Sequence, residues 1–158
     1  MGSFDWSAFF ETTAAEIRSA FSDAAASIDH VGSTSVAGLD GKASLDVVVG
    51  LAGRSVPASA REAMRRLEFS RLRVRRSGRI YFARSGQPPI FVHVVPWGDP
   101  RLNELLRFRD LLRADAGLTD RYAALKREIE PRSANGYATA KRRFVAAALS
   151  APRRRAEW

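Results

Sequence analysis

Residues 29–51 have the sequence DHVGSTSVAGLDGKASLDVVVGL, and this stretch carries two signals that bear on the fold. Its second part, residues 44–51, is apolar and rich in valine, which predicts a buried central strand. Its first part places Gly32 before Ser33, Thr34 and Ser35. Such a run is typical of a turn that starts a helix, and the backbone amides of such a turn can also hold a phosphate.

The composition is that of a globular chain. Of the 158 residues, 46% are hydrophobic and 27% are charged, a balance that favours a packed core over disorder. We expect a single domain over residues 1–150 and a basic tail over residues 151–158. The chain has no cysteine, which excludes disulfides, thiolate metal sites and thiol nucleophiles.

The N-terminal residues place acids early and lack a basic start followed by an apolar run, so no signal peptide is predicted. No segment approaches the roughly 18 apolar residues that a membrane span needs. We therefore expect a cytoplasmic protein without a membrane partner.

The formal net charge of +9 raises the question of nucleic-acid binding. The arginines are scattered along the chain, and no zinc finger, RNP-type motif or helix-turn-helix signature is present. A nucleic-acid-binding module is therefore the least favoured of the functional hypotheses.

The apolar pattern predicts one α+β domain, with a mixed β-sheet flanked by helices and a helical C-terminal third. Helices are expected over residues 6–25 and 56–69. Residues 27–31 fit either a short strand or the approach to the Gly-Ser turn. Further strands are expected at 71–76 and 79–84, joined near Ser77 and Gly78, and within the segment 88–97, where the strand begins after the Pro pair and ends at Pro96. The helices of the C-terminal third are expected over 99–115, 118–130 and 135–150.

Three titratable residues stand in or beside these strands. Asp46 is the one acid of an apolar strand, so it needs a metal, a base or a backbone donor as partner unless it lies at the exposed end. The two histidines of the chain are His30, beside the turn, and His93, in the strand FVHVV. Because side chains alternate along a strand, Asp46 shares a face with Val48, and His93 lies opposite Val92 and Val94.

The lysines form a second group of candidates. Among 26 basic residues, lysine occurs at three positions, Lys42, Lys126 and Lys141. A compact ammonium suits a phosphate as a point charge, although composition alone does not exclude chance.

Taken together, these motifs resemble those of the GrpB family. The resemblance is carried by IDHVGSTSVAGLDGKASLDVVVGL, then FVHVVPWGDPRLNELLRFRDLLRAD and YAALKREIE, and finally YATAKRRFV. The segments occur in the family's order and spacing and cover nearly the whole chain.

The resemblance implies a nucleotidyltransferase-like fold that binds a nucleotide or another phosphorylated small molecule. It places Gly32, Ser33, Thr34 and Ser35 on a phosphate-binding turn, and it implies Asp46 as a ligand of a divalent metal, Mg²⁺ or Mn²⁺, with His93 as a second ligand. The remaining polar family positions, which would act on the phosphates or as general base, are His30, His93, Lys42, Arg109, Lys126 and Lys141.

Two departures from the nucleotidyltransferase pattern bear on the activity. Val48 occupies the position of a second carboxylate, and His93 stands where a third is expected. Mg²⁺ prefers oxygen ligands, so one Asp with histidines is a poor two-metal site. Ala37 also replaces a proline that is common in the family.

Two main hypotheses follow. In the first, the chain is a transferase acting on a nucleotide or related metabolite, with Asp46, His93 and His30 as catalytic residues. In the second, it is a non-catalytic nucleotide-binding or accessory protein with a reduced metal site. A pocket shared by Asp46, His93 and His30 would favour the first.

Overall fold

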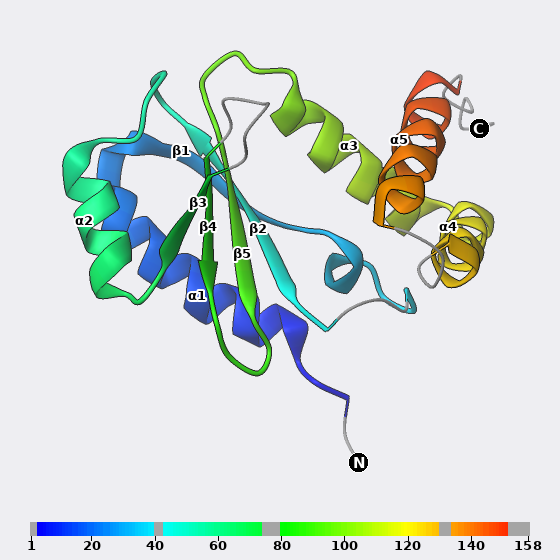
Figure 1. The fold of residues 1–158 in the computed structure, drawn as a ribbon, viewed down its shortest axis with the longest axis horizontal. Helices are drawn as coiled ribbons and strands as arrows, with labels where there is room; N and C mark the ends of the chain where they lie inside the picture. The colour runs from blue at the N-terminus through cyan, green and yellow to red at the C-terminus, as the bar shows by residue number, and fades with distance from the viewer. Residues whose placement is uncertain (1–2, 40–42, 74–79, 130–133, 152–158) are drawn as a thin grey trace, which may run out of the picture.

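The computed structural model describes residues 3–39, 43–73, 80–129 and 134–151. It contains a five-stranded sheet with strand order β1-β2-β5-β4-β3 (Figure 1). Strands β2 and β5 are parallel, whereas the other neighbouring pairs are antiparallel. The predicted α+β class with a mixed sheet is therefore confirmed. The strands are β1 (Ala25–Val31), β2 (Leu45–Leu51), β3 (Ser70–Arg73), β4 (Ile80–Arg84) and β5 (Ile90–Val95).

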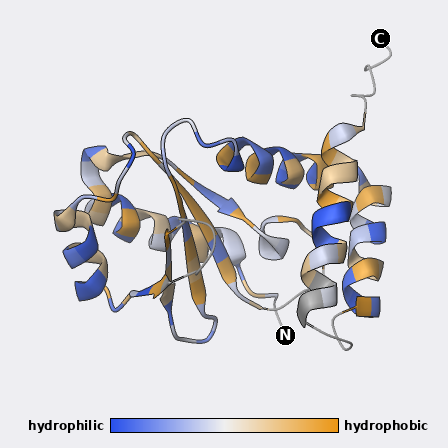
Figure 2. Cartoon of the chain, turned by 45° about the horizontal axis from the view of Figure 1, so that its top comes forward, coloured by the Kyte–Doolittle hydropathy of each residue, from blue (hydrophilic) through white to orange (hydrophobic). Residues whose placement is uncertain are grey.

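One face of the sheet is covered by two helices from the N-terminal half. Val47, Val49 and Val92 point to this face and are fully buried with Ile17 and Met64. Figure 2 shows hydrophobic residues concentrated in the central strands, as expected for a sheet that forms the core. The covering helices are α1 (Trp6–Phe21) and α2 (Ala58–Arg66).

The opposite face is covered over only part of its width. Val31, Val48 and Val95 pack there against leucines of α3 (Arg101–Ala114), including Leu102 and Leu105. Across the rest of this face, Phe91 and Leu72 are 37% and 41% exposed. The sheet is therefore buried on both sides at β1 and β2 and on one side at β3 and β4.

The helices of the C-terminal third lie beside the sheet (Figure 1) and form their own apolar cluster. Leu112, Leu118 and Tyr122 are buried in it, and Phe108 and Phe144 pack against them. This cluster holds α3 against α4 (Ala116–Ile129) and α5 (Ala134–Ser150). The predicted helical third is thus confirmed.

Element boundaries differ from the sequence prediction at one instructive place. The helix expected over residues 6–25 ends at Phe21, and β1 already begins at Ala25 after a single 3₁₀ turn, η1 (Ser22–Ala24). Alanine favours a helix locally, but pairing of Ala25–Val31 with β2 supplies a ladder of backbone hydrogen bonds instead.

The hairpin expected from residues 71–84 is present, because β3 and β4 pair antiparallel. Its predicted turn at Ser77 and Gly78 lies outside the described residues, as does the basic tail beyond residue 151. Across the part of the chain that the structure describes, no helix has the length and apolar character needed to cross a membrane.

Replacing Ile17 tests the core between the sheet and the two helices α1 and α2. Ile17 is 0% exposed, so Ile17→Ala should lower the free energy of unfolding by about 2–5 kcal/mol through lost burial and a cavity. Leu72→Ala, at a side chain 41% exposed, is the control and should cost far less. Urea denaturation of both variants measures the difference, and equal losses would contradict this account of the core.

Candidate functional site

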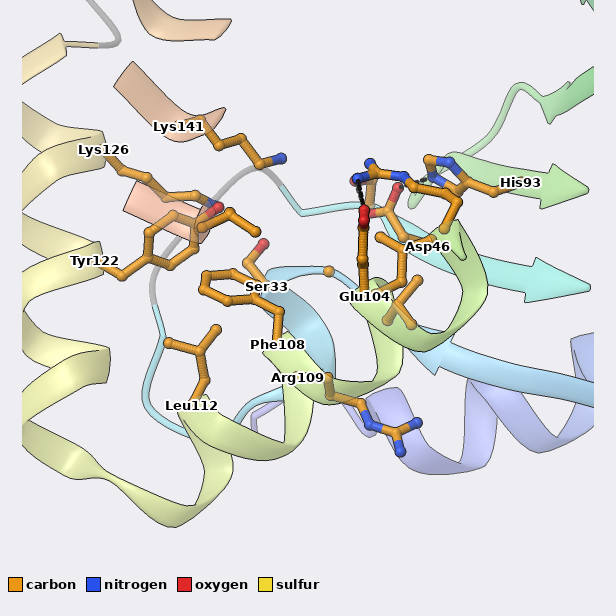
Figure 3. Close-up of a pocket in the computed structure, with 16 residues that line it drawn as sticks. Ser33, Asp46, His93, Glu104, Phe108, Arg109, Leu112, Tyr122, Lys126 and Lys141 are labelled. Carbon is orange, nitrogen blue, oxygen red and sulfur yellow. Dashed lines mark hydrogen bonds and ion pairs between the residues drawn. The ribbon is translucent and has the colours of Figure 1, made fainter. Parts of the chain in front are cut away.

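A cavity of about 450 Å³ lies between the partly covered face of the sheet, α3 and the α4–α5 pair (Figure 3). Its lining combines charged and apolar side chains drawn from all three regions. The lining residues are Val31, Gly32, Ser33, Ser44, Asp46, His93, Arg101, Glu104, Leu105, Phe108, Arg109, Leu112, Tyr122, Lys126, Lys141 and Val145.

Asp46 and His93 meet on the sheet surface at one end of this cavity. Parallel pairing sets His93 beside Val48, two residues beyond Asp46 on the same face. The His93 Nε2 lies 3.5 Å from Oδ1 of Asp46, and both side chains are 25% exposed. The pairing of the two strands thus brings these two residues together. A carboxylate beside an imidazole can orient that imidazole for proton transfer.

The backbone of Gly32 runs directly over Asp46. A Cβ on Gly32 would lie 2.6 Å from Oδ2 and 2.9 Å from Cβ of Asp46. Gly32 also has a φ of 77°, which side chains rarely allow. Glycine is therefore required here for both space and backbone conformation, and its presence fixes the turn against the carboxylate.

The hydroxyl residues after Gly32 have different partners. Residues Ser33–Ser35 form a single 3₁₀ turn, η2, and not the start of an α-helix. Thr34 donates its hydroxyl to the carbonyl of Ser44 at 3.0 Å, and Ser35 donates to the carbonyl of Gly32 at 2.5 Å. Ser33 is the member of the run that lines the cavity. Of the predicted phosphate-binding hydroxyls, the geometry thus offers Ser33 to a ligand and uses the others to hold the turn.

His30 lies on the other face of the sheet, beside Val47 in the antiparallel register. Its ring stacks on Phe10 of α1 at 5.2 Å between centroids, and Nε2 is 3.0 Å from the Thr34 hydroxyl. Because that hydroxyl donates its proton to Ser44, it accepts from Nε2–H, so His30 is the donor in this contact. The expectation that His30 shares a pocket with Asp46 and His93 is therefore wrong, since antiparallel pairing turns it away.

Burial is the main reason that His30 stays neutral. Desolvation, aided by the nearby Arg113 and Arg109 and opposed by Asp46, lowers the pKa of His30 from 6.5 to about 4. His30 links β1, η2 and the residue before β2 through one hydrogen-bonded chain.

Two of the three lysines point into the cavity (Figure 3). Lys126 lies over the Tyr122 ring, with Nζ 5.1 Å from its centroid. Lys141 extends from α5, and burial lowers its pKa from the ordinary value, with Asp46 opposing this and Arg101 adding to it. Lys42, the third predicted lysine, lies outside the described residues.

Arg109 is placed differently from its predicted role on phosphate. Its guanidinium turns away from the cavity (Figure 3), lies 2.9 Å from Asp110 and 3.8 Å from Asp29, and donates to the carbonyl of His30 at 3.2 Å. One helical turn later, Arg113 donates to the carbonyl of Ser35 at 2.9 Å. Both arginines thus tie α3 to the backbone around the turn.

Sequence analysis missed Arg101 and Glu104, which line the cavity from the first turn of α3. Their side chains form an ion pair at 3.8 Å, shown as a dashed line in Figure 3. Their spacing of three residues on a predicted helix indicated one shared face, but nothing in the sequence indicated what that face would meet.

The residues around Asp46 do not fit the two-metal arrangement that the family resemblance implies. Within the described ranges, no group of three or more acidic or histidine side chains is arranged to hold a metal ion. Val48, at the position of the second carboxylate, is buried against leucines of α3. Glu104 is paired with Arg101. One carboxylate and one imidazole are too few to hold two Mg²⁺ ions.

Comparison with known proteins agrees with this geometry at the level of the family. The family model described as GrpB protein matches residues 3–151. The chain belongs to the GrpB family.

Similar proteins span much of its length. A UPF0157 protein of Halalkalibacterium halodurans is 31% identical over 147 residues, covering 89% of this chain and 74% of that protein. Glutamate-rich protein GrpB of Alkalihalophilus pseudofirmus is 25% identical over 151 residues, covering 89% of this chain and 87% of that protein. The crystal structure of GrpB from Enterococcus faecalis has a TM-score of 0.74 at 23% identity, covering 91% of this chain and 92% of that chain. The structural similarity bears on the fold alone.

The contact between Gly32 and Asp46 in this GrpB-family chain can be tested against a matched glycine. Gly32→Ala should destabilise by about 1–2 kcal/mol for the backbone conformation, and by a further 1–3 kcal/mol, roughly, for the clash with Asp46. Gly38→Ala has the same φ of 77° but no atom within 4 Å, so it should show the backbone cost alone. Equal losses in urea denaturation would contradict the predicted clash.

The buried neutral His30 predicts acid sensitivity. Between its ordinary pKa of 6.5 and its folded pKa of about 4, the unfolded chain binds a proton that the folded chain does not. Stability should therefore fall as pH is lowered through this window. His30→Gln keeps an N–H donor without the titration, so its midpoint of thermal unfolding should fall less between pH 7 and pH 5. His93→Gln measures the contribution of the other histidine, and an undiminished pH dependence in His30→Gln would refute the prediction.

Proposed function

We propose that this chain binds a phosphate-bearing small molecule, a nucleotide in the first instance, in the cavity beside Asp46. The observation that supports this most strongly is the convergence of Arg101, Lys126 and Lys141 on a cavity that also contains Ser33. Cations with hydroxyl donors are the groups that hold phosphate oxygens in proteins.

The electrostatic state of Lys141 supports an anionic ligand. Its pKa is lowered mainly by burial, which means that the site favours its charge less than water does. Arg101, which adds to this effect, already pairs with Glu104 at 3.8 Å. An anion placed between these cations would counter this lowering of the Lys141 pKa, because an opposite charge within a few ångströms favours the protonated amine.

We further propose that the site catalyses nucleotidyl or related group transfer. In this scheme, an acceptor hydroxyl gives its proton to His93 while its oxygen forms a bond to the α-phosphorus of a nucleoside triphosphate. The bond from that phosphorus to the leaving oxygen breaks, and pyrophosphate departs with the electron pair. Asp46, 3.5 Å from His93, orients the ring and stabilises the imidazolium. Lys126 and Lys141 would balance the phosphate charge.

A non-catalytic binding or accessory role is the second candidate. It is favoured by Val48, which is 0% exposed beneath α3 at the position where the transferase pattern has a carboxylate. Such a protein would retain the anion cavity and release no pyrophosphate.

Binding is tested by calorimetry with ATP, GTP, CTP and UTP, each in Mg²⁺, Mn²⁺ or EDTA. Lys141→Met keeps the length of the side chain without its charge and should weaken binding about tenfold or more, because a charge-assisted contact is lost. Arg66→Gln is the control, since its side chain is 73% exposed on α2 and away from the cavity. We expect affinity to persist in EDTA. Failure of all four nucleotides would refute nucleotide binding.

Metal dependence and turnover separate the remaining alternatives. Affinity that requires Mn²⁺ or Mg²⁺ and disappears in Asp46→Asn would support a metal site. Pyrophosphate release that is lost in His93→Gln, with affinity retained, would support the transferase. Tight binding without release over a panel of acceptors would favour the accessory role. Binding of nucleic acid with a steep salt dependence would instead support a nucleic-acid-binding module.

A further inference from the structure

The half of the sheet left uncovered by α3 presents a flat apolar surface. Side chains on this face of β5, β4 and β3 include two aromatic rings, and two of the side chains are among the most exposed hydrophobic ones described. We define the open sheet face as Leu72, Tyr81, Ala83 and Phe91. Their counterparts on the other face, including Phe82 and Val92, are buried beneath α1 and α2.

The register places this face directly against the cavity. In the mixed sheet, Phe91 is the lateral neighbour of Asp46, and Tyr81 is the lateral neighbour of His93. The Tyr81 and His93 rings meet edge to face, with centroids 5.0 Å apart. His93 also lines the cavity. Among the described residues, the surface therefore begins where the polar site ends, with no element between them.

We propose that the open sheet face binds the nucleoside base of the ligand whose phosphates occupy the cavity. This inference rests on the proposed function and extends it from a phosphate-bearing molecule to one with a planar heteroaromatic ring. The positive charge of the cavity selects the anionic end of such a molecule. Because His93 lines the cavity and also contacts Tyr81, the other end of the molecule would lie on Tyr81 and Phe91.

Ring stacking is the contact that suits this surface. Aromatic side chains bind the π-face of any base with little dependence on sequence, and each stack contributes measurably to affinity. The exposure of Phe91, 37%, leaves area for such a contact. A nucleotide would thus cover apolar surface that the helices leave in water.

The test compares ATP with inorganic tripolyphosphate, which has the phosphates without the base. For the wild-type chain, ATP should bind about tenfold or more tightly than tripolyphosphate if one base stack contributes. Phe91→Leu keeps an apolar side chain without the ring and should remove most of that ratio while leaving tripolyphosphate affinity unchanged. Phe91→Tyr retains the ring and should restore the ratio. Trp97→Leu controls for loss of an exposed aromatic elsewhere, since Trp97 is 69% exposed and does not belong to the open sheet face.

Each remaining outcome is decisive. Equal wild-type affinity for ATP and tripolyphosphate would overturn the base site while leaving the anion cavity in place. If neither ATP nor tripolyphosphate binds, the proposed function itself is overturned. Equal weakening of both ligands by Phe91→Leu would assign Phe91 a structural role. Dissociation of a dimer by Phe91→Leu, seen in sedimentation without a change in the ratio, would make this face a contact between copies of the chain.

Discussion

The close approach of Gly32 to Asp46 is the constraint on which the site depends. With a separation of 2.6 Å between Oδ2 and the place a Cβ would occupy, the turn leaving β1 presses against the carboxylate of β2. The chain from His30 through Thr34 to Ser44 holds the same turn from the other face, and Arg113 holds it from α3. Most polar groups of the turn therefore serve its shape, and Ser33 is the hydroxyl of the turn that lines the cavity.

Unequal covering of the sheet explains why the site lies where it does. Helices α1 and α2 bury one face, whereas α3 covers the other only over β1, β2 and the end of β5 at Val95. Asp46 and His93 stand at the boundary of that covering, and each side chain is 25% exposed. At this boundary, a carboxylate and an imidazole avoid the full free-energy cost of removal from water, and a ligand can reach them. The helical third completes the cavity by adding lysines from α4 and α5.

Local pattern predicted much of the fold and part of the site. The valine-rich stretch 44–51 correctly predicted the buried strand β2 (Leu45–Leu51), whereas the parallel pairing with β5 placed Asp46 and His93 on one face. The motifs of the family resemblance cover nearly the whole chain, and they lie at the turn, in the strands and in the helices that face the cavity. Prediction failed at residues 22–25, where alanine favours helix but strand pairing decides the structure.

What the sequence determined by itself is the order of elements, the glycine demanded by the turn, and the residue types available for phosphate chemistry. Tertiary structure alone decided how they are used. Antiparallel pairing turned His30 to the opposite face, and Asp29, Asp110 and the His30 carbonyl engaged Arg109 away from the cavity. The packing of α3 also determined which half of the sheet stays open. These outcomes depend on contacts between residues far apart in the chain, and no local periodicity encodes such contacts.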